Sequence, residues 1–135
     1  GGLTVGTGTG AAGTYLTGPN GMTLYIFTKD SEDTSACSGD CAKAWPPFIV
    51  KSRPRAGKSV LSGRIGVIRR SGGRFQATYF GRPLYYYVGD RKPGQILCQD
   101  VTEFGGVWRV VRPPRRSRIG CTVAHPRSHS CPIAT

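Results

Sequence analysis

The sequence GMTLYIFTKD at residues 21–30 recurs as GRPLYYYVGD at residues 81–90. Both copies follow the pattern Gly-x-x-Leu-Tyr-x-aromatic-x-x-Asp, without a gap inside the match. Repetition of this kind indicates one supersecondary unit that is used twice. In each copy a Gly-bearing turn (GPNG or FGRP) precedes an alternating strand, so each copy is predicted to form a β-hairpin.

The repeat places two aromatic residues and one carboxylate at matching positions of both copies. These motif residues are Tyr25, Phe27, Asp30, Tyr85, Tyr87 and Asp90. Aromatic residues in alternating strands typically pack in the core and across strands, so packing is favoured over stacking on sugars or bases. An Asp after a strand typically accepts backbone N–H groups of the next turn, which predicts a structural role for Asp30 and Asp90.

The sequence CSGDC at residues 37–41 predicts a disulfide at the start of a short helix near residues 38–45. Ser38 or Asp40 is expected to cap this helix, and Pro46-Pro47 to end it. The spacing of Cys37 and Cys41 fits neither a Cys-x-x-Cys redox motif nor haem attachment, so a structural disulfide is predicted in an exported protein.

The remainder of the central segment is rich in strand patterns. Three alternating stretches at 64–70, 74–80 and 83–88 are joined by short connections, which is typical of an antiparallel meander. A last strand at 107–111 is expected to close the core with Trp108. The predicted fold class is therefore mainly β: an antiparallel sheet or meander built from two similar hairpin repeats, with one short helix near 38–45.

Both ends differ in composition from residues 14–111, which form the predicted domain. Residues 1–13 are rich in Gly and Thr, and their Gly-x-Gly-x-x-Gly lacks a βαβ context, so a flexible tether is predicted. Residues 112–135 are rich in Arg, Pro and Ser and are predicted to lie outside the core as a basic tail. Their two Cys and two His do not have zinc-finger spacing, so neither a metal nor a cofactor is predicted.

The charge is uneven. The chain has 19 Lys and Arg against 7 Asp and Glu, a net charge of +12. Residues 51–74 contain no acid and form a basic segment that favours contact with polyanions, although a solvated surface is the more frequent role of such cations. The candidate polyanion-binding residues are Lys51, Arg53, Arg55, Lys58, Arg64, Arg69, Arg70 and Arg74.

The two Tyr-x-aromatic-x-x-Asp motifs, the stretch CSGDCAKAWPP and the stretch GGVWRVV resemble the secreted-repeat family of predicted bacterial lipoproteins. The resemblance covers residues 14–111 and implies an extracellular or cell-envelope location. It implies no reaction. In that family a tether such as residues 1–13 would join the domain to a lipidated cysteine, which would lie in a segment outside this chain. No stretch of the sequence is apolar for long enough to predict a transmembrane helix.

The sequence contains little catalytic chemistry. Residues 1–111 have no His, and neither a nucleophile elbow, a phosphate loop nor an HExxH motif is present. No catalytic residue is predicted, and the leading hypothesis is a secreted or envelope-anchored non-enzymatic domain that binds or scaffolds at the cell surface. Its specific partner is left open, with an anionic surface polymer and an envelope protein as the candidates. Two alternatives stay open: a polyanion binder that uses residues 51–74, and an enzyme that uses Asp30 and Asp90 as a carboxylate pair.

Overall fold

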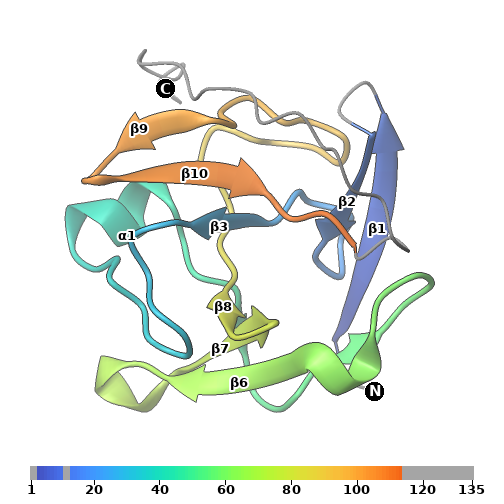
Figure 1. Ribbon diagram of the computed structural model, residues 1–135, viewed down its shortest axis with the longest axis horizontal. Helices are drawn as coiled ribbons and strands as arrows, with labels where there is room; N and C mark the ends of the chain where they lie inside the picture. Colours follow the sequence, from blue (N-terminus) through green and yellow to red (C-terminus); the bar gives the residue numbers. More distant parts are fainter. Residues whose placement is uncertain (1–2, 11–12, 114–135) are drawn as a thin grey trace.

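The computed structural model describes residues 3–10 and 13–113, and it confirms a mainly β fold that contains one short α-helix (Figure 1). In chain order its elements are β1 (Thr4–Gly10), β2 (Gly13–Thr17), β3 (Tyr25–Phe27), α1 (Asp40–Ala44), β4 (Ile49–Val50), β5 (Arg55–Ala56), the 3-10 turn η1 (Ser62–Arg64), β6 (Ile65–Arg69), the 3-10 turn η2 (Ser71–Gly73), β7 (Phe75–Tyr79), β8 (Arg82–Pro83), β9 (Val101–Glu103) and β10 (Gly106–Val110).

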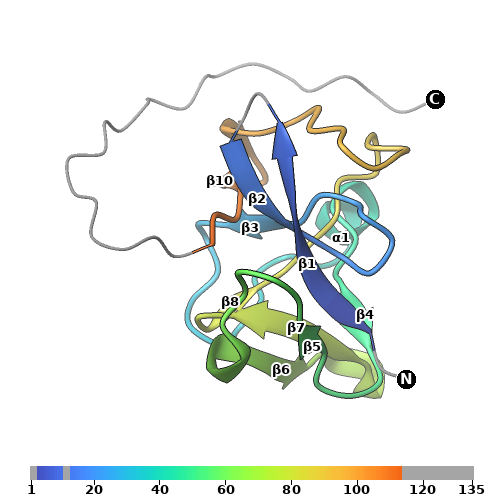
Figure 2. The ribbon, with the colours of Figure 1, turned by 90° about the vertical axis from the view of Figure 1, so that its right-hand side faces the viewer.

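The strands form three small sheets. Their orders are β2-β1-β5, β3-β10-β9 and β4-β7-β6, with β8 added to β7. All pairs are antiparallel except β1 with β5, which is parallel. The sheet of β6 and β7 lies at the lower end of the molecule in Figures 1 and 2, and β9 and β10 lie at the upper end.

The predicted meander is present as β6, β7 and β8, but its third strand is shorter than expected. After β8 the second copy pairs only through isolated bridges, in which Tyr85 lies opposite Tyr25 on one side and Pro47 on the other. The prediction of a continuous strand over 83–88 is therefore wrong in extent. Two short partners from different parts of the chain hold this segment in an extended conformation.

The prediction of a flexible tether is wrong for residues 4–10, which form β1. This strand pairs with β2 from Gly6–Thr17 to Gly10–Gly13, and Val5 is fully buried. The ring of Tyr15 lies directly over Gly8, where a Cβ atom would come within 2.9 Å of it. The glycine therefore supplies the space that the cross-strand aromatic needs, as in other Gly–aromatic strand pairs.

Each Leu-Tyr pair of the repeat divides its side chains between two cores, because successive residues of a strand point to opposite faces. Leu24 and Leu84 belong to a largely aliphatic core with Leu16, Phe48 and Ala77. The tyrosines of the same pairs belong to a second core that is rich in aromatic rings and contains both tryptophans. The repeat therefore has the same packing role in both copies.

Helix α1 and its disulfide confirm two predictions. The helix covers Asp40–Ala44, and the sulfur atoms of Cys37 and Cys41 are 2.06 Å apart. The predicted side-chain cap is wrong: the N-cap residue is Gly39, and no side chain bonds to the first turn. The backbone carbonyl of Ser38 accepts the N–H of Cys41 instead.

The predicted tail at 112–135 lies outside the described residues from position 114 onward, as do Cys121, His125, His129 and Cys131. Among the described residues, no helix has the length and apolar character that a membrane span requires.

Candidate functional site

The two copies of the repeat meet at their tyrosines. The N–H of Tyr25 donates to the carbonyl of Tyr85 over 2.7 Å, and the N–H of Tyr85 donates to the carbonyl of Tyr25 over 2.9 Å. The motif strands of the two copies therefore lie antiparallel to each other at the centre of the molecule.

Around this central bridge each copy pairs with the end of the other copy. In the first copy, β3 pairs with β10, and the N–H of Thr28 donates to Val107. In the second copy, the N–H of Tyr86 donates to Pro46 and that of Val88 to Ala44. Each copy thus supplies the strand that the other copy lacks, so the two are interlocked rather than side by side.

The motif tyrosines and aspartates repeat this exchange in their side chains. The hydroxyl of Tyr25 donates to Asp90 Oδ2, and the hydroxyl of Tyr85 donates to Asp30 Oδ2, each over 2.7 Å. The Tyr of each copy is therefore bonded to the Asp of the other copy. We call these two hydrogen bonds the Tyr–Asp pairs.

The second carboxylate oxygen of each Asp accepts a backbone N–H from the loop that follows it, as expected from the position of these residues after strands. The donors are Ala36 for Asp30, over 2.6 Å, and Leu97 for Asp90, over 2.9 Å. The residues next in sequence, Cys37 and Cys98, are both buried. Each Asp therefore joins its own loop to the other copy.

Burial affects the chemistry of both pairs. Asp90 is only 6% exposed and Asp30 is half-buried, and desolvation raises the pKa of each carboxyl above its ordinary value. Desolvation, together with the adjacent carboxylate, raises the pKa of Tyr25 and Tyr85 above the usual range of a phenol. Both hydroxyls therefore stay protonated at neutral pH and act as donors.

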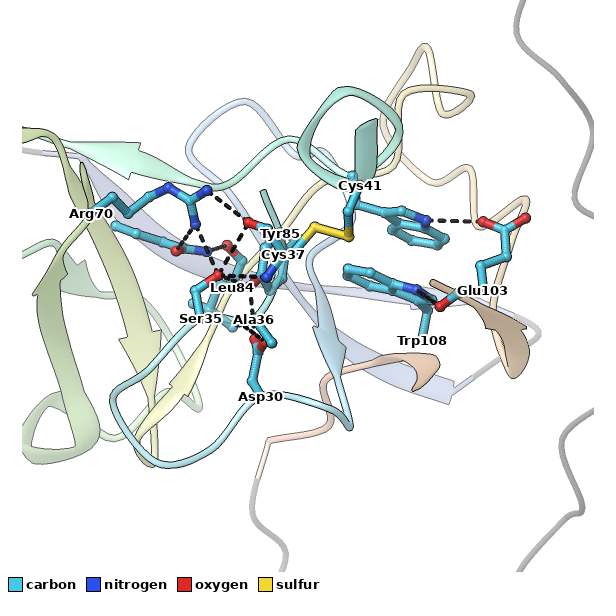
Figure 3. Close-up of a disulfide and its surroundings, with 12 residues drawn as sticks. Asp30, Ser35, Ala36, Cys37, Cys41, Arg70, Leu84, Tyr85, Glu103 and Trp108 are labelled. Carbon is cyan, nitrogen blue, oxygen red and sulfur yellow. Dashed lines mark hydrogen bonds between the residues drawn. A yellow bond between two sulfur atoms is a disulfide. The ribbon is translucent and has the colours of Figure 1, made fainter. Parts of the chain in front are cut away.

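The Tyr85–Asp30 pair extends into a polar network beside the disulfide (Figure 3). Ser35 Oγ lies 2.6 Å from the Tyr85 hydroxyl. The guanidinium of Arg70 donates to Ser35 Oγ, to Gln76 Oε1 and to the carbonyl of Cys37, over 3.0, 2.9 and 2.8 Å. Arg70 therefore joins the end of β6 to the disulfide loop.

On the other side of the central bridge, the two tryptophans lie face to face. The rings of Trp45 and Trp108 are stacked at 4.1 Å with an angle of 5° between their planes. Both indole N–H groups are bonded to Glu103: Trp45 to the carboxylate over 3.1 Å and Trp108 to the backbone carbonyl over 3.2 Å (Figure 3). Phe27 stacks on the other face of Trp108 at 4.0 Å.

The basic segment lies mainly on β5, η1, β6 and η2 and the loops between them, at the lower end of the molecule in Figures 1 and 2. Two of its eight cations donate side-chain hydrogen bonds to other parts of the protein, and of the rest Arg64 lies over the ring of Phe80, 4.9 Å from the centroid. Arg70 bonds as described, and the exposed Arg53 donates to the backbone carbonyls of Ile65 and Ser62. The others are exposed and make no ion pair within residues 3–10 and 13–113: Lys51, Arg55, Lys58, Arg64, Arg69 and Arg74.

Two surface hollows flank the loop of residues 31–38. One, of about 350 Å³, is lined by Asp30, Glu32 and Phe80 among others, and the second, of about 410 Å³, by Ser35 and Arg70 among others. Within the part of the chain that the structure describes, no group of three or more His, Cys, Asp or Glu side chains could hold a metal ion.

Sequence reasoning did not identify Ser35, Trp45, Gln76 or Glu103 as members of the central network. One signal was available for the first tryptophan. Each tryptophan is followed three positions later by an apolar residue, Phe48 after Trp45 and Val111 after Trp108. The carbonyl of Phe48 accepts the N–H of Ala77, and in the same way the carbonyl of Val111 accepts the N–H of Leu16. The repeat therefore extends beyond the Leu-Tyr motif.

The fold and this centre define a duplicated β domain, stabilised by a disulfide, in which two interlocked copies contribute to both cores. The model of the family described as a secreted repeat of unknown function matches residues 6–49 and 66–112, which is more than half of the chain. The chain belongs to this family, and the resemblance noted from the motifs is confirmed. Membership indicates an extracellular location. No curated protein and no solved structure matches the chain.

Proposed function

We propose that this chain is a non-enzymatic domain of the cell surface that binds or scaffolds an anionic partner through its basic segment. The residues best suited to catalysis already have structural partners. Asp30 and Asp90 each hold the tyrosine of the other copy and a backbone N–H of their own loop. An enzyme would need both carboxylates directed at one substrate, and no observation favours that arrangement.

The observation that carries the proposal is the set of six exposed cations without ion-pair partners in the described part of the chain. Arg69 and Arg74 lie at the two sides of the η2 turn, and Lys51 follows β4, whose Val50 pairs with Phe75. Clustered cations of one sign raise the local concentration of polyanions and accelerate their association. Surface polymers that carry phosphate, sulfate or carboxylate groups are the ligand class that fits.

The test is a salt titration of binding to heparin and to duplex DNA, two polyanions of known charge density. Binding by the basic segment predicts a linear fall of log K with log salt, with a slope of about −0.9 for each DNA phosphate neutralised. The variant with Lys51, Arg69 and Arg74 all changed to Gln should reduce that slope by about 2 to 3.

The matched control changes three exposed lysines elsewhere to Gln: Lys29, Lys43 and Lys92. It removes the same net charge but none of the basic segment, so its slope should stay close to that of the unmodified chain. Equal losses in both triple variants would mean that net charge alone drives association. Absence of any polyanion binding at 50 mM salt would overturn the proposal.

A further inference from the structure

The end of the molecule that carries the basic segment also exposes large apolar side chains. Leu3, Leu61 and Phe75 are 41%, 46% and 39% exposed. Leu3 directly precedes β1, Leu61 directly precedes η1, and Phe75 begins β7 after η2. In both views of the molecule η1, β6 and η2 lie at the same lower end, where the described chain also begins (Figures 1 and 2).

Phe75 has one cation directly opposite it in the sheet and two more at chain positions next to Phe75 or to its other cross-strand partner. On one side its cross-strand partner in β6 is Arg69, and on the other side its partner in β4 is Val50, which Lys51 follows. Arg74 precedes it in the chain. The pairing fixes the ring beside the Arg69 side chain, since residues directly opposite in an antiparallel pair share one face of the sheet.

Leu61 has a similar setting at the other end of β6. Its backbone N–H donates to the hydroxyl of Tyr79 over 2.9 Å, and its carbonyl accepts the N–H of Arg64 over 3.0 Å. Arg53 donates to two carbonyls of the same turn. These bonds fix the backbone of Leu61 while its side chain stays exposed, and the guanidinium of Arg64 lies over the ring of Phe80, which is also exposed.

The backbone of Leu3 is bonded to β5, which carries a further cation, Arg55, opposite Thr4. Its carbonyl accepts the N–H of Arg55 over 2.8 Å, where β1 and β5 begin their parallel pairing. The lower end therefore exposes Leu3, Leu61 and Phe75 in the same part of the fold as the cations of the basic segment. We call this set of residues the basic–apolar end.

We propose that the basic–apolar end docks onto the surface of a lipid bilayer that contains anionic headgroups. This inference rests on the proposed function and specifies its partner. Cations attract anionic headgroups and act over roughly a Debye length, while exposed Leu and Phe side chains gain free energy by entering the interface. A soluble polyanion would use the cations but would leave the three apolar side chains in water. Binding that uses both kinds of residue distinguishes a membrane from a polymer.

The test uses sedimentation of the full chain with vesicles of phosphatidylcholine alone and of phosphatidylcholine with 30% phosphatidylglycerol. The mixed vesicles should bind the chain and the neutral vesicles should bind it much less. Each cation changed to Gln should lower the partition coefficient about fivefold at 0.1 M salt. The apolar variant Leu61→Ser with Phe75→Ser should lower it about tenfold or more while leaving heparin binding unchanged.

The control for the apolar variant is Leu97→Ser with Phe104→Ser, two side chains that are exposed to a similar degree in other parts of the fold. Circular dichroism checks that both variants are folded. An apolar variant that binds the mixed vesicles as well as the control does would overturn the inference, because the vesicles would then act as a polyanion only. Heparin binding without vesicle binding would overturn it too but leave the proposed function standing. Binding to neither ligand would overturn both.

Discussion

Changing Tyr25 to Phe removes one hydroxyl and should break one of the two Tyr–Asp pairs. The hydroxyl donates to Asp90, which is 6% exposed, so water has little access to replace the lost donor. A hydrogen bond to a charged group contributes about 1.5–3 kcal/mol, and a buried acceptor left without its donor costs its desolvation as well. We expect the free energy of unfolding to fall by about 2–3 kcal/mol.

Tyr85→Phe breaks the other pair and should cost less, about 1 kcal/mol, because Asp30 is half-buried and water can reach its carboxylate. Tyr86→Phe is the matched control. Tyr86 lies next in the chain, and its hydroxyl makes no hydrogen bond to the residues that the structure describes. Removal of the Tyr86 hydroxyl should change the free energy of unfolding by less than about 0.5 kcal/mol.

The assay is thermal and urea unfolding of the single variants and of a double-mutant cycle. For a domain of this size, 2–3 kcal/mol corresponds to a drop in Tm of about 8–20 °C. Tyr25→Phe and Asp90→Ala should show a coupling energy of at least about 1.5 kcal/mol. Tyr25→Phe and Asp30→Ala are not partners and should add within about 0.5 kcal/mol. The exchange of partners between copies would be refuted if Tyr25→Phe coupled to Asp30→Ala as strongly as to Asp90→Ala. Stabilisation of the protein by either Asp→Ala change would refute it too.

Three further outcomes are expected. Peptide mapping without reductant should recover Cys37 and Cys41 as one disulfide, and its reduction should cost about 2 kcal/mol because the closed loop is short. Arg70→Gln should lower Tm and make that disulfide faster to reduce, since Arg70 holds the Cys37 carbonyl. Burial raises the folded pKa of Asp90 above its unfolded value of about 3.9, so its contribution to stability is complete below that value and is lost as pH rises through the folded pKa. As the pH is lowered from 7 to 4, the free energy of unfolding of the unmodified chain should therefore increase relative to that of Asp90→Asn.

The sequence predicted those features that depend on neighbouring residues. Alternation of apolar residues and the turn sequences predicted the β6–β7–β8 meander, and Pro46-Pro47 predicted the end of α1. The first predicted hairpin is present only as the bridge between Thr17 and Thr23, because β2 pairs with β1 and β3 pairs with β10. The cysteine spacing predicted the disulfide. Each of these rests on a few adjacent residues, so no knowledge of distant partners was needed.

The exchange between copies could not be predicted in the same way. The sequence shows that the motif occurs twice. The same alternation of apolar residues would result whether the strands of one copy paired with each other or with the strands of the other copy. The choice depends on which Trp segment lies beside each Leu-Tyr strand, and that is a long-range pairing. Strand β1 was missed for a related reason: its glycines have low strand propensity, and the ring of Tyr15 over Gly8 supplies the packing that the strand itself lacks.

The duplication also indicates where in the chain a specific partner would bind. The two interlocked copies form the central bridge, the Tyr–Asp pairs and the tryptophan stack. The residues of these three features stabilise the fold, so their side chains are already bonded or packed within the protein. The family model leaves a gap at residues 50–65 between its two matches. That gap contains Leu61 and, among its cations, Lys51, Lys58 and Arg64, all exposed. This segment has no counterpart in the repeat, although its Val50, Val60 and Ile65 side chains pack in the aliphatic core. Exposed cations and the exposed Leu61 therefore lie in a segment that the duplication itself does not account for.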